Sequence, residues 1–299
     1  MGRALADAFA TAREVFEEVD DALGQKLSSL MWQGPEDELV LTENAQPAIM
    51  AASLAIITIL KRDCGFDLAR HARLVAGHSL GEYSALCAAG AFTLSDTARL
   101  LKARGRAMQS AVPVGEGGMS ALLGAEIGQA EELAHECAAA GGGICVVAND
   151  NAPGQVVISG SKAAIDKAPE IAKAKGIKRA MALNVSAPFH CPLMQPAADS
   201  MREVLAGVTI RPLAVPVVSN VTAVQTIEPE TIRRLLVEQV TGRVRWRESV
   251  LAFRGLGIET TVEAGGAKVL TGMVKRTDKD LQTVTLDTPA DIEAFAKTL

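Results

Sequence analysis

The chain has 299 residues, of which 48% are hydrophobic and 22% are charged. This length and composition allow one large α/β domain or a main domain with a smaller insert, and they exclude a disordered chain. The net charge of −5 comes without a long run of like charges, so no nucleic-acid partner is indicated.

No segment predicts a membrane or an export route. The longest largely apolar stretch, residues 47–60, is too short to span a bilayer and is more typical of a buried helix. The first residues lack the apolar region and cleavage site of a signal peptide. The five cysteines are odd in number and form no C-x-x-C pair, which favours reduced, mostly buried thiols in a cytoplasm over a catalytic cysteine.

The first third of the chain predicts mainly helices. Residues 3–23 carry an apolar stripe at spacings of three and four, which Gly24 would end, and its members are Leu5, Phe9, Ala12, Phe16, Val19 and Leu23. Pro47 is expected in the first turn of the next helix. Residues 72–90 predict a strand, a sharp glycine turn and a helix, and Ser95 is expected to cap a further helix.

The sequence pattern changes near residue 114. Four strand-like and two helix-like segments follow in the order β-α-β-β-α-β, which predicts a smaller ferredoxin-like α+β subdomain over residues 114–183. The α/β pattern then resumes, with buried strands expected at residues 215–221 and 259–265. Residues 1–113 and 184–299 would therefore form one α/β core around the insert.

The sequence GHSLG, residues 77–81, lies between the predicted strand and helix. A G-x-S-x-G turn at this place is a nucleophile elbow, and it favours glycine on both sides because a Cβ would crowd it. It lifts the serine hydroxyl to a helix N-terminus, where backbone N–H groups can stabilise an oxyanion. Ser79 is therefore the candidate nucleophile, and an ordinary serine in a glycine-rich turn is the alternative.

A nucleophilic serine needs a base, and the chain has four histidines. His71 and His135 fall in polar stretches typical of the surface, and His78 adjoins the serine on a turn where neighbouring side chains diverge. His190, in a proline-bounded loop just beyond the insert, is the best candidate by elimination. The alternative is a loop histidine without a role.

Together these segments resemble the malonyl-CoA:acyl carrier protein transacylase family. The resemblance runs from about residue 2 to the end and rests on four motifs in the family's order: GHSLGEYSAL for the elbow, RGRAMQ for the arginine motif, NAPGQVVISG for the insert strand pair and SAPFHCPLM for the histidine motif. It implies a hydrolase-like α/β core with a parallel sheet and a ferredoxin-like subdomain.

The resemblance also implies roles for single residues. Ser79 matches the nucleophile, His190 the general base, and Arg104 the residue that pairs with the free carboxylate of the malonyl group. A planar guanidinium binds a carboxylate through two hydrogen bonds, which suits that role, although a solvated helix arginine is the alternative from sequence alone.

Three further positions match supporting residues of the family. The Gln239 carbonyl would orient the histidine, Leu80 would supply one oxyanion N–H, and Phe189 would disfavour an α-methyl branch. In EAGGAKVLTG, Gly266 and Ala267 stand where relatives usually carry Pro and Gly, which would make that loop less rigid.

Family members begin with a strand and a GQGSQ-like loop whose glutamine supplies the second oxyanion N–H. This chain opens at MGRALADAF, so the first strand and this loop are expected to be missing, through a mis-set start or a truncation. Loss of one such donor typically costs about a hundredfold in rate.

The resemblance implies a cytoplasmic enzyme that transfers a malonyl group from malonyl-CoA to the phosphopantetheine thiol of acyl carrier protein, through a malonyl-serine intermediate. The pathway would be fatty acid or polyketide synthesis, with no metal or redox cofactor and no nucleic-acid or membrane partner. Two alternatives stay open. A serine hydrolase could use the same elbow, although it would give Arg104 no carboxylate to bind. A weakly active or inactive carrier-protein-binding module would be favoured by the missing loop.

Overall fold

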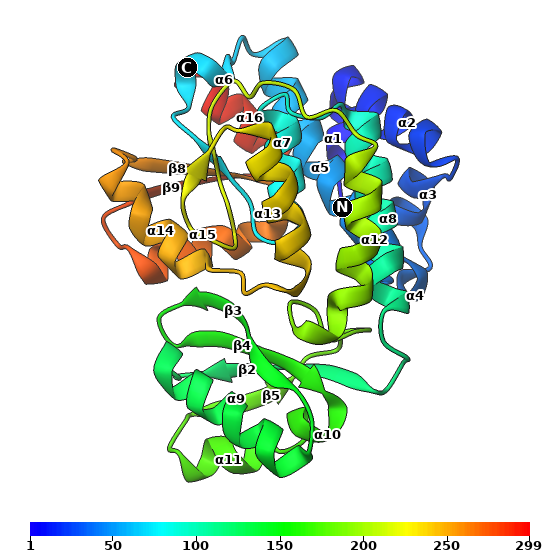
Figure 1. Cartoon of the computed structure of the whole chain (residues 1–299). Coiled ribbons are helices and arrows are strands. Elements are labelled where there is room, and N and C mark those ends of the chain that lie inside the picture. Colours follow the sequence, from blue (N-terminus) through cyan, green and yellow to red (C-terminus); the bar gives the residue numbers. More distant parts are fainter.

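A computed structural model describes all 299 residues and shows a larger body and a smaller subdomain, the subdomain spanning residues 117–182 (Figure 1). A layer of helices forms the N-terminal part of the larger body. The helices that precede the first strand are α1 (Arg3–Ala8), α2 (Ala10–Leu23), α3 (Leu27–Gln33), α4 (Glu36–Leu39), α5 (Thr42–Asp63) and α6 (Leu68–His71). Helices α2 and α5 pack against each other and against α8 (Leu94–Ser110). Their apolar faces contribute to a core cluster of 43 buried residues.

Three local predictions in this helical layer are wrong. The helix expected over residues 3–23 is broken at Phe9, whose extended backbone (φ −123°, ψ 125°) separates α1 from α2. Pro47 lies inside α5 rather than in its first turn, because α5 begins at Thr42. The cap of α8 is Thr93, whose hydroxyl accepts the Asp96 N–H at 3.0 Å, whereas Ser95 lies within the helix.

Helix α5 is longer than its apolar stretch suggested. With 22 residues it is the one helix long and apolar enough to cross a membrane by length and composition. Of its most apolar window, 61% is buried inside the protein, as in a core helix of a globular domain.

The strands of the larger body form two separate small sheets. In the first, β1 (Val75–Ala76) pairs in parallel with β6 (Val217–Val218), which pairs antiparallel with β7 (Gln225–Thr226). In the second, β8 (Thr260–Ala264) pairs in parallel with β9 (Gln282–Leu286). Strand β1 therefore lies at the edge of its sheet.

The prediction that residues 259–265 form a buried strand is wrong about burial. Strand β8 exists, but Thr260 is exposed and Val262 keeps 41% of its surface accessible. The physical reason is that β8 has only one neighbouring strand, so part of its surface stays uncovered.

The subdomain has the predicted ferredoxin-like order and lies beneath the larger body in Figure 1. Its four strands form one antiparallel sheet in the order β3-β4-β2-β5, where they comprise β2 (Gly117–Leu123), β3 (Cys145–Ala152), β4 (Gln155–Ser161) and β5 (Arg179–Ala182). Helices α9 (Ile127–Gly141), α10 (Lys162–Ile165) and α11 (Ala168–Ala174) cover it and share a core of 15 buried residues. The second predicted helix is split into α10 and α11, with Pro169 in the first turn of α11.

Backbone hydrogen bonds join the subdomain to the larger body. The Val244 N–H donates to the Ala148 carbonyl at 2.8 Å, and the Asp150 N–H donates to the Val244 carbonyl at 2.9 Å. Arg247 reinforces this junction, because its guanidinium reaches the carboxylate of Asp150, a residue only 1% exposed, at 2.8 Å. Strand β3 of the subdomain is thus tied directly to the segment that leads into α14 (Trp246–Gly255).

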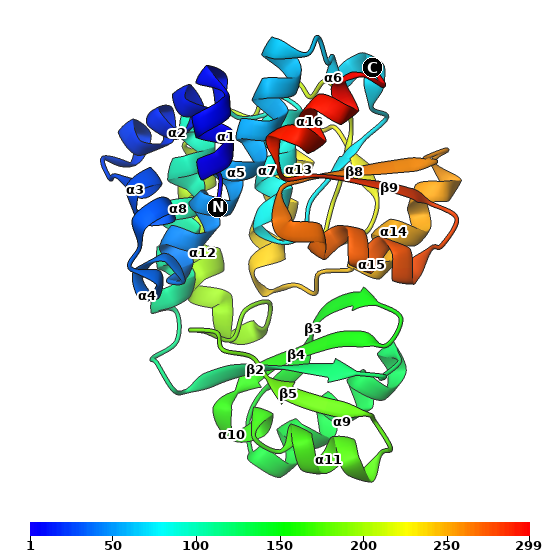
Figure 2. The same ribbon diagram turned by 180° about the vertical axis from the view of Figure 1, so that it is seen from behind.

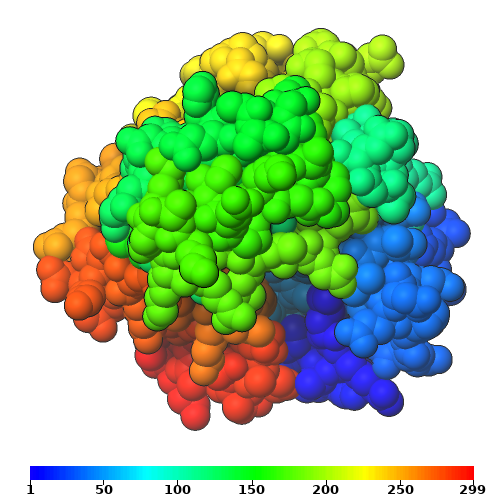
Figure 3. Space-filling view, turned by 90° about the horizontal axis from the view of Figure 1, so that it is seen from below, coloured from blue at the N-terminus to red at the C-terminus, as the bar shows by residue number.

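The remaining helices complete the larger body: α7 (Leu80–Ala88), α12 (Gln195–Ala206), α13 (Pro229–Thr241), α15 (Val269–Thr277) and α16 (Pro289–Ala296). The view from behind shows α15 between the β8–β9 sheet and the subdomain (Figure 2). The space-filling view from the subdomain side shows a hollow between the green subdomain, the dark blue N-terminal residues and the orange residues of the C-terminal part of the chain (Figure 3).

Candidate active site

The turn between β1 and α7 holds Ser79 in a strained backbone conformation. Ser79 has φ 53° and ψ −112° and forms the N-cap of α7. A Cβ on Gly77 would lie 2.0 Å from the Gly81 carbonyl oxygen, so only glycine fits there. A Cβ on Gly81 would meet no atom within 4 Å, so the expectation that crowding requires glycine on both sides is wrong for Gly81.

Asn220 holds this turn from the loop that follows β6, the strand paired with β1. Its side-chain oxygen accepts the Ser79 N–H at 2.6 Å, and its amide donates to the Gly77 carbonyl at 2.7 Å. Sequence reasoning missed Asn220. The available signal was a polar residue near the end of the predicted buried strand at 215–221. In the structure Asn220 follows β6, which brings it next to the elbow.

His190 lies within hydrogen-bond distance of the Ser79 hydroxyl. The Ser79 Oγ to His190 Nε2 distance is 2.8 Å, and His190 Nδ1 lies 2.8 Å from the Gln239 carbonyl oxygen. Because a carbonyl can only accept, Nδ1 carries the proton and Nε2 is free to accept one from Ser79. Burial, followed by the positive charge of Arg104, lowers the pKa of His190 to about 3. The imidazole is therefore neutral at physiological pH, as a general base must be.

His190 also has an unusual backbone conformation. His190 has φ 57°, in the left-handed region that favours glycine, and it is only 4% exposed. The turn that contains His190 follows β5 and precedes α12, so the chain that leaves the subdomain brings this side chain to Ser79.

Arg104 is buried beside the same hydroxyl. With 1% of its surface exposed, it is not the solvated helix arginine that the sequence alone would allow. Its Nη2 donates to Ser79 Oγ at 3.1 Å and to Gln239 Oε1 at 2.8 Å, and its Nη1 donates to Gln46 Oε1 at 2.7 Å. Burial lowers the pKa of Arg104, but a guanidinium keeps its charge in proteins. The arrangement places a fixed cation beside the Ser79 hydroxyl.

Gln239 connects these groups. Besides accepting from Arg104, its side-chain amide donates to the Ser79 carbonyl at 3.0 Å and to Glu82 Oε2 at 2.7 Å. The side-chain roles of Gln46, Glu82 and Gln239 could not be found by sequence reasoning. Their contacts join α5, α7 and α13, which lie far apart along the chain.

The other predicted residues surround this centre. The N–H of Leu80, the first residue of α7, has no preceding helical turn to bind and is free to face an oxyanion. Phe189 is partly buried and packs against both the main core and a subdomain cluster. His78 turns away from the hydroxyl: its Nε2 lies 2.8 Å from Asn151 Oδ1 in β3, and its ring packs edge-on against Trp246. The exposed His71 and His135 take no part.

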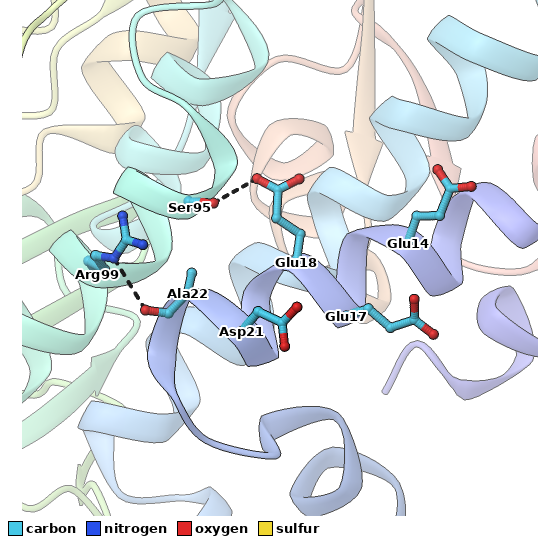
Figure 4. Close-up of a pocket in the computed structure, with 7 residues that line it drawn as sticks. All are labelled: Glu14, Glu17, Glu18, Asp21, Ala22, Ser95 and Arg99. Atoms are coloured by element: carbon cyan, nitrogen blue, oxygen red, sulfur yellow. Dashed lines mark hydrogen bonds between the residues drawn. The ribbon is translucent and has the colours of Figure 1, made fainter.

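One surface pocket lies away from Ser79. It is formed by α2 and α8 and is lined by Glu14, Glu17, Glu18, Asp21, Ala22, Ser95 and Arg99 (Figure 4). The Ser95 hydroxyl donates to Glu18, and Arg99 donates to the Ala22 carbonyl. None of the residues around Ser79 lines this pocket. No group of three or more His, Cys, Asp and Glu side chains is arranged to hold a metal ion.

Known proteins are similar to this chain in sequence and fold. The family model described as an acyl transferase domain matches residues 1–290. A malonyl CoA-acyl carrier protein transacylase of Bacillus subtilis is 41% identical over 299 residues, covering 100% of this chain and 92% of the relative. One of Salmonella typhimurium is 42% identical over 281 residues, covering 94% and 89%.

Solved structures agree with these relatives. The acyl-carrier-protein S-malonyltransferase of Bartonella henselae has a TM-score of 0.96 at 51% identity, covering 100% of this chain and 94% of that one. A malonyl transacylase in complex with a type II polyketide synthase acyl carrier protein has a TM-score of 0.95 at 40% identity, covering 100% and 95%.

Proposed function

Because the chain belongs to the malonyl-CoA:acyl carrier protein transacylases of the acyl transferase family, we propose that it transfers a malonyl group from malonyl-CoA to the phosphopantetheine thiol of acyl carrier protein. The observation that carries this proposal is the buried Arg104 guanidinium 3.1 Å from Ser79 Oγ. A malonyl group on Ser79 ends in a carboxylate, and this cation can bind it through charge-assisted hydrogen bonds.

The first half of the reaction makes a malonyl-serine ester. His190 Nε2 takes the hydroxyl proton as Ser79 Oγ attacks the thioester carbon, and the Gln239 carbonyl holds the protonated ring through Nδ1. Leu80 N–H stabilises the oxyanion of the tetrahedral intermediate. The carbon–sulfur bond then breaks, and the CoA thiolate leaves with the proton that His190 held.

The second half returns Ser79 to its starting state. The phosphopantetheine thiol passes its proton to His190 Nε2 and attacks the ester carbon. The new carbon–sulfur bond forms, the ester bond to Ser79 breaks, and Ser79 Oγ recovers the proton from His190. Arg104 binds the malonyl carboxylate through both halves, and the bulk of Phe189, next to His190 in the chain, disfavours an α-methyl branch on the acyl group.

The proposed function extends to the roles of the two parts of the chain and to the location of the enzyme. Residues 1–113 and 184–299 form the catalytic domain, and residues 114–183 form the subdomain that borders the site through Asn151. The enzyme acts in the cytoplasm, in fatty acid or polyketide synthesis.

Intact-protein mass spectrometry after exposure to malonyl-CoA tests the proposal. The wild-type chain should gain one malonyl adduct, and Ser79→Ala should gain none. Ser110→Ala, which removes an exposed hydroxyl from the end of α8, is the matched control and should be labelled like wild type. A comparable adduct on Ser79→Ala would show that another residue carries the acyl group.

A further inference from the structure

One buried carboxyl group beside the site has no part in the steps above. Glu82 lies on α7, one turn after the nucleophile, and is 2% exposed. Its Oε2 accepts the Gln239 side-chain amide at 2.7 Å and the Asn220 backbone N–H at 3.2 Å. Burying a carboxyl group costs free energy unless its oxygens have hydrogen-bond partners, so its presence here points to a role in the site.

Both partners of Glu82 also hold Ser79. Asn220 accepts the Ser79 N–H through its side chain, and Gln239 donates to the Ser79 carbonyl. Gln239 further accepts Arg104 Nη2 through Oε1, and its backbone carbonyl binds His190. Gln239 and Asn220 therefore connect Glu82 to the residues proposed as nucleophile, base and carboxylate-binding cation.

The chemistry of the neighbours fixes the orientation of the Gln239 amide. A glutamine amide can turn by 180°, which exchanges its oxygen and its nitrogen. An ionised Glu82 can only accept and Arg104 can only donate, so the observed orientation satisfies both contacts. In the reverse orientation, oxygen would face Glu82 Oε2 and N–H groups would face the guanidinium. Without an acceptor at position 82, this selection is lost.

The charge of Glu82 responds to pH in the neutral range. Burial raises the pKa of Glu82 to about 7, against the lowering effect of hydrogen bonds from Gln239 and Asn220 and of the Arg104 charge. The other titratable groups that act on it are Arg104, whose charge lowers the pKa of Glu82, and Tyr83 on the same helix, whose own pKa burial raises to about 12. A protonated Glu82 can donate as well as accept, so it selects the Gln239 orientation less strictly.

We propose that Glu82 is a positioning residue that holds the Gln239 amide in its observed orientation. Through this amide, Glu82 orients the Arg104 guanidinium toward the carboxylate of the acyl group. Glu82 thereby sets the preference for acyl groups that end in a carboxylate. This inference rests on the proposed function, since it takes a malonyl group as the substrate.

The isosteric variant Glu82→Gln tests the proposal, with the exposed Glu17→Gln as control. Single-turnover acylation is measured with malonyl-CoA and with acetyl-CoA, which lacks the carboxylate. Glu82→Gln should lower kcat/KM about 10-fold for malonyl-CoA and less than about 3-fold for acetyl-CoA, through loss of one charge-assisted contact. Equal losses for the two thioesters would overturn the proposal.

The wild-type enzyme supplies a second measurement that does not depend on the folding of a variant. The ratio of malonyl to acetyl kcat/KM should fall as pH decreases from 8 to 6, as Glu82 gains its proton, and Glu82→Gln should remove this dependence. Effects of His190 cancel in the ratio, because both thioesters use the same base. A constant wild-type ratio between pH 6 and 8 would overturn the role of Glu82, whereas absence of any malonyl-serine would overturn the proposed function itself.

Discussion

Arg104 Nη2 lies 3.1 Å from Ser79 Oγ, inside a site where the arginine is 1% exposed. A buried cation therefore stands beside the atom that would carry the acyl group. A simple hydrolase of neutral esters has no use for such a charge, because burying a guanidinium without an anionic ligand costs free energy. The position of Arg104 thus favours acyl groups that bring their own carboxylate.

Arg104→Ala should change substrate preference more than it changes the chemistry. Loss of a charge-assisted pair of hydrogen bonds should reduce malonyl transfer about 100-fold, with a much smaller loss for acetyl transfer. The measurement is single-turnover acylation with both thioesters. Arg106→Ala on the same helix removes an exposed partner of Glu43 and should leave both rates unchanged. Equal losses for both thioesters in Arg104→Ala would show that the arginine is structural.

The two glycines of the elbow should respond differently to the same substitution. Gly77→Ala forces a Cβ to within 2.0 Å of a backbone oxygen, and it should destabilise the fold by about 2 kcal/mol or more and abolish acylation. Gly81→Ala places its Cβ in open space on a helix and should change stability by no more than about 1 kcal/mol. Urea unfolding of both variants checks this, and equal effects would contradict the described turn.

The Arg247–Asp150 pair should matter for both stability and activity. Arg247→Ala leaves the 1%-exposed Asp150 carboxylate without its cation, which should destabilise the protein by about 3 kcal/mol. Asp150 adjoins Asn151, which contacts His78 beside the nucleophile, so acylation should slow as well. Arg254, also on α14, is itself exposed and pairs with the exposed Asp280 at 2.8 Å and with Asp278 at 3.6 Å, so Arg254→Ala should change stability by less than about 1 kcal/mol. Calorimetric melting of the two variants distinguishes these outcomes.

Glu82 should also leave a pH signature in stability. Its pKa is about 7 in the folded protein, above the ordinary value of 4.5, so the folded state binds the proton more tightly than the unfolded state. The resulting stabilisation is fully present below pH 4.5 and is lost as pH rises through 7. Relative to Glu82→Gln, the wild type should lose about 1.4 kcal/mol per pH unit between pH 4.5 and 7. Urea unfolding at several pH values measures this difference, and a constant difference would contradict the raised pKa.

The order of the elements could be predicted from the sequence, because hydrophobic periodicity and glycine turns are local signals. The subdomain order and the strand–turn–helix at Ser79 both rest on such signals. Local signals gave three wrong predictions in the helical layer, namely an unbroken helix through Phe9, Pro47 in a first turn and Ser95 as a cap. The extended backbone at Phe9 interrupts an apolar stripe that continues across it, so the periodicity carried no sign of the break.

The candidate site could be predicted only in part. Ser79 and His190 belong to motifs, but their 2.8 Å contact spans 111 positions in the chain. The contacts of Gln46, Asn220 and Glu82 depend on how α5, β6 and α7 converge, which no local pattern contains. The exposure of β8 likewise follows from sheet pairing rather than from its own residues.

The backbone angles of Ser79 and His190 oppose the proposed function to thermal stability. Ser79 and His190 have φ values of 53° and 57°, a region that costs a non-glycine residue about 1–2 kcal/mol. Glycine would relax both positions, so a library screened for melting temperature alone would tend to replace the two residues that the proposed reaction needs. Engineering for heat tolerance must therefore hold these two positions fixed and seek its gains elsewhere in the fold.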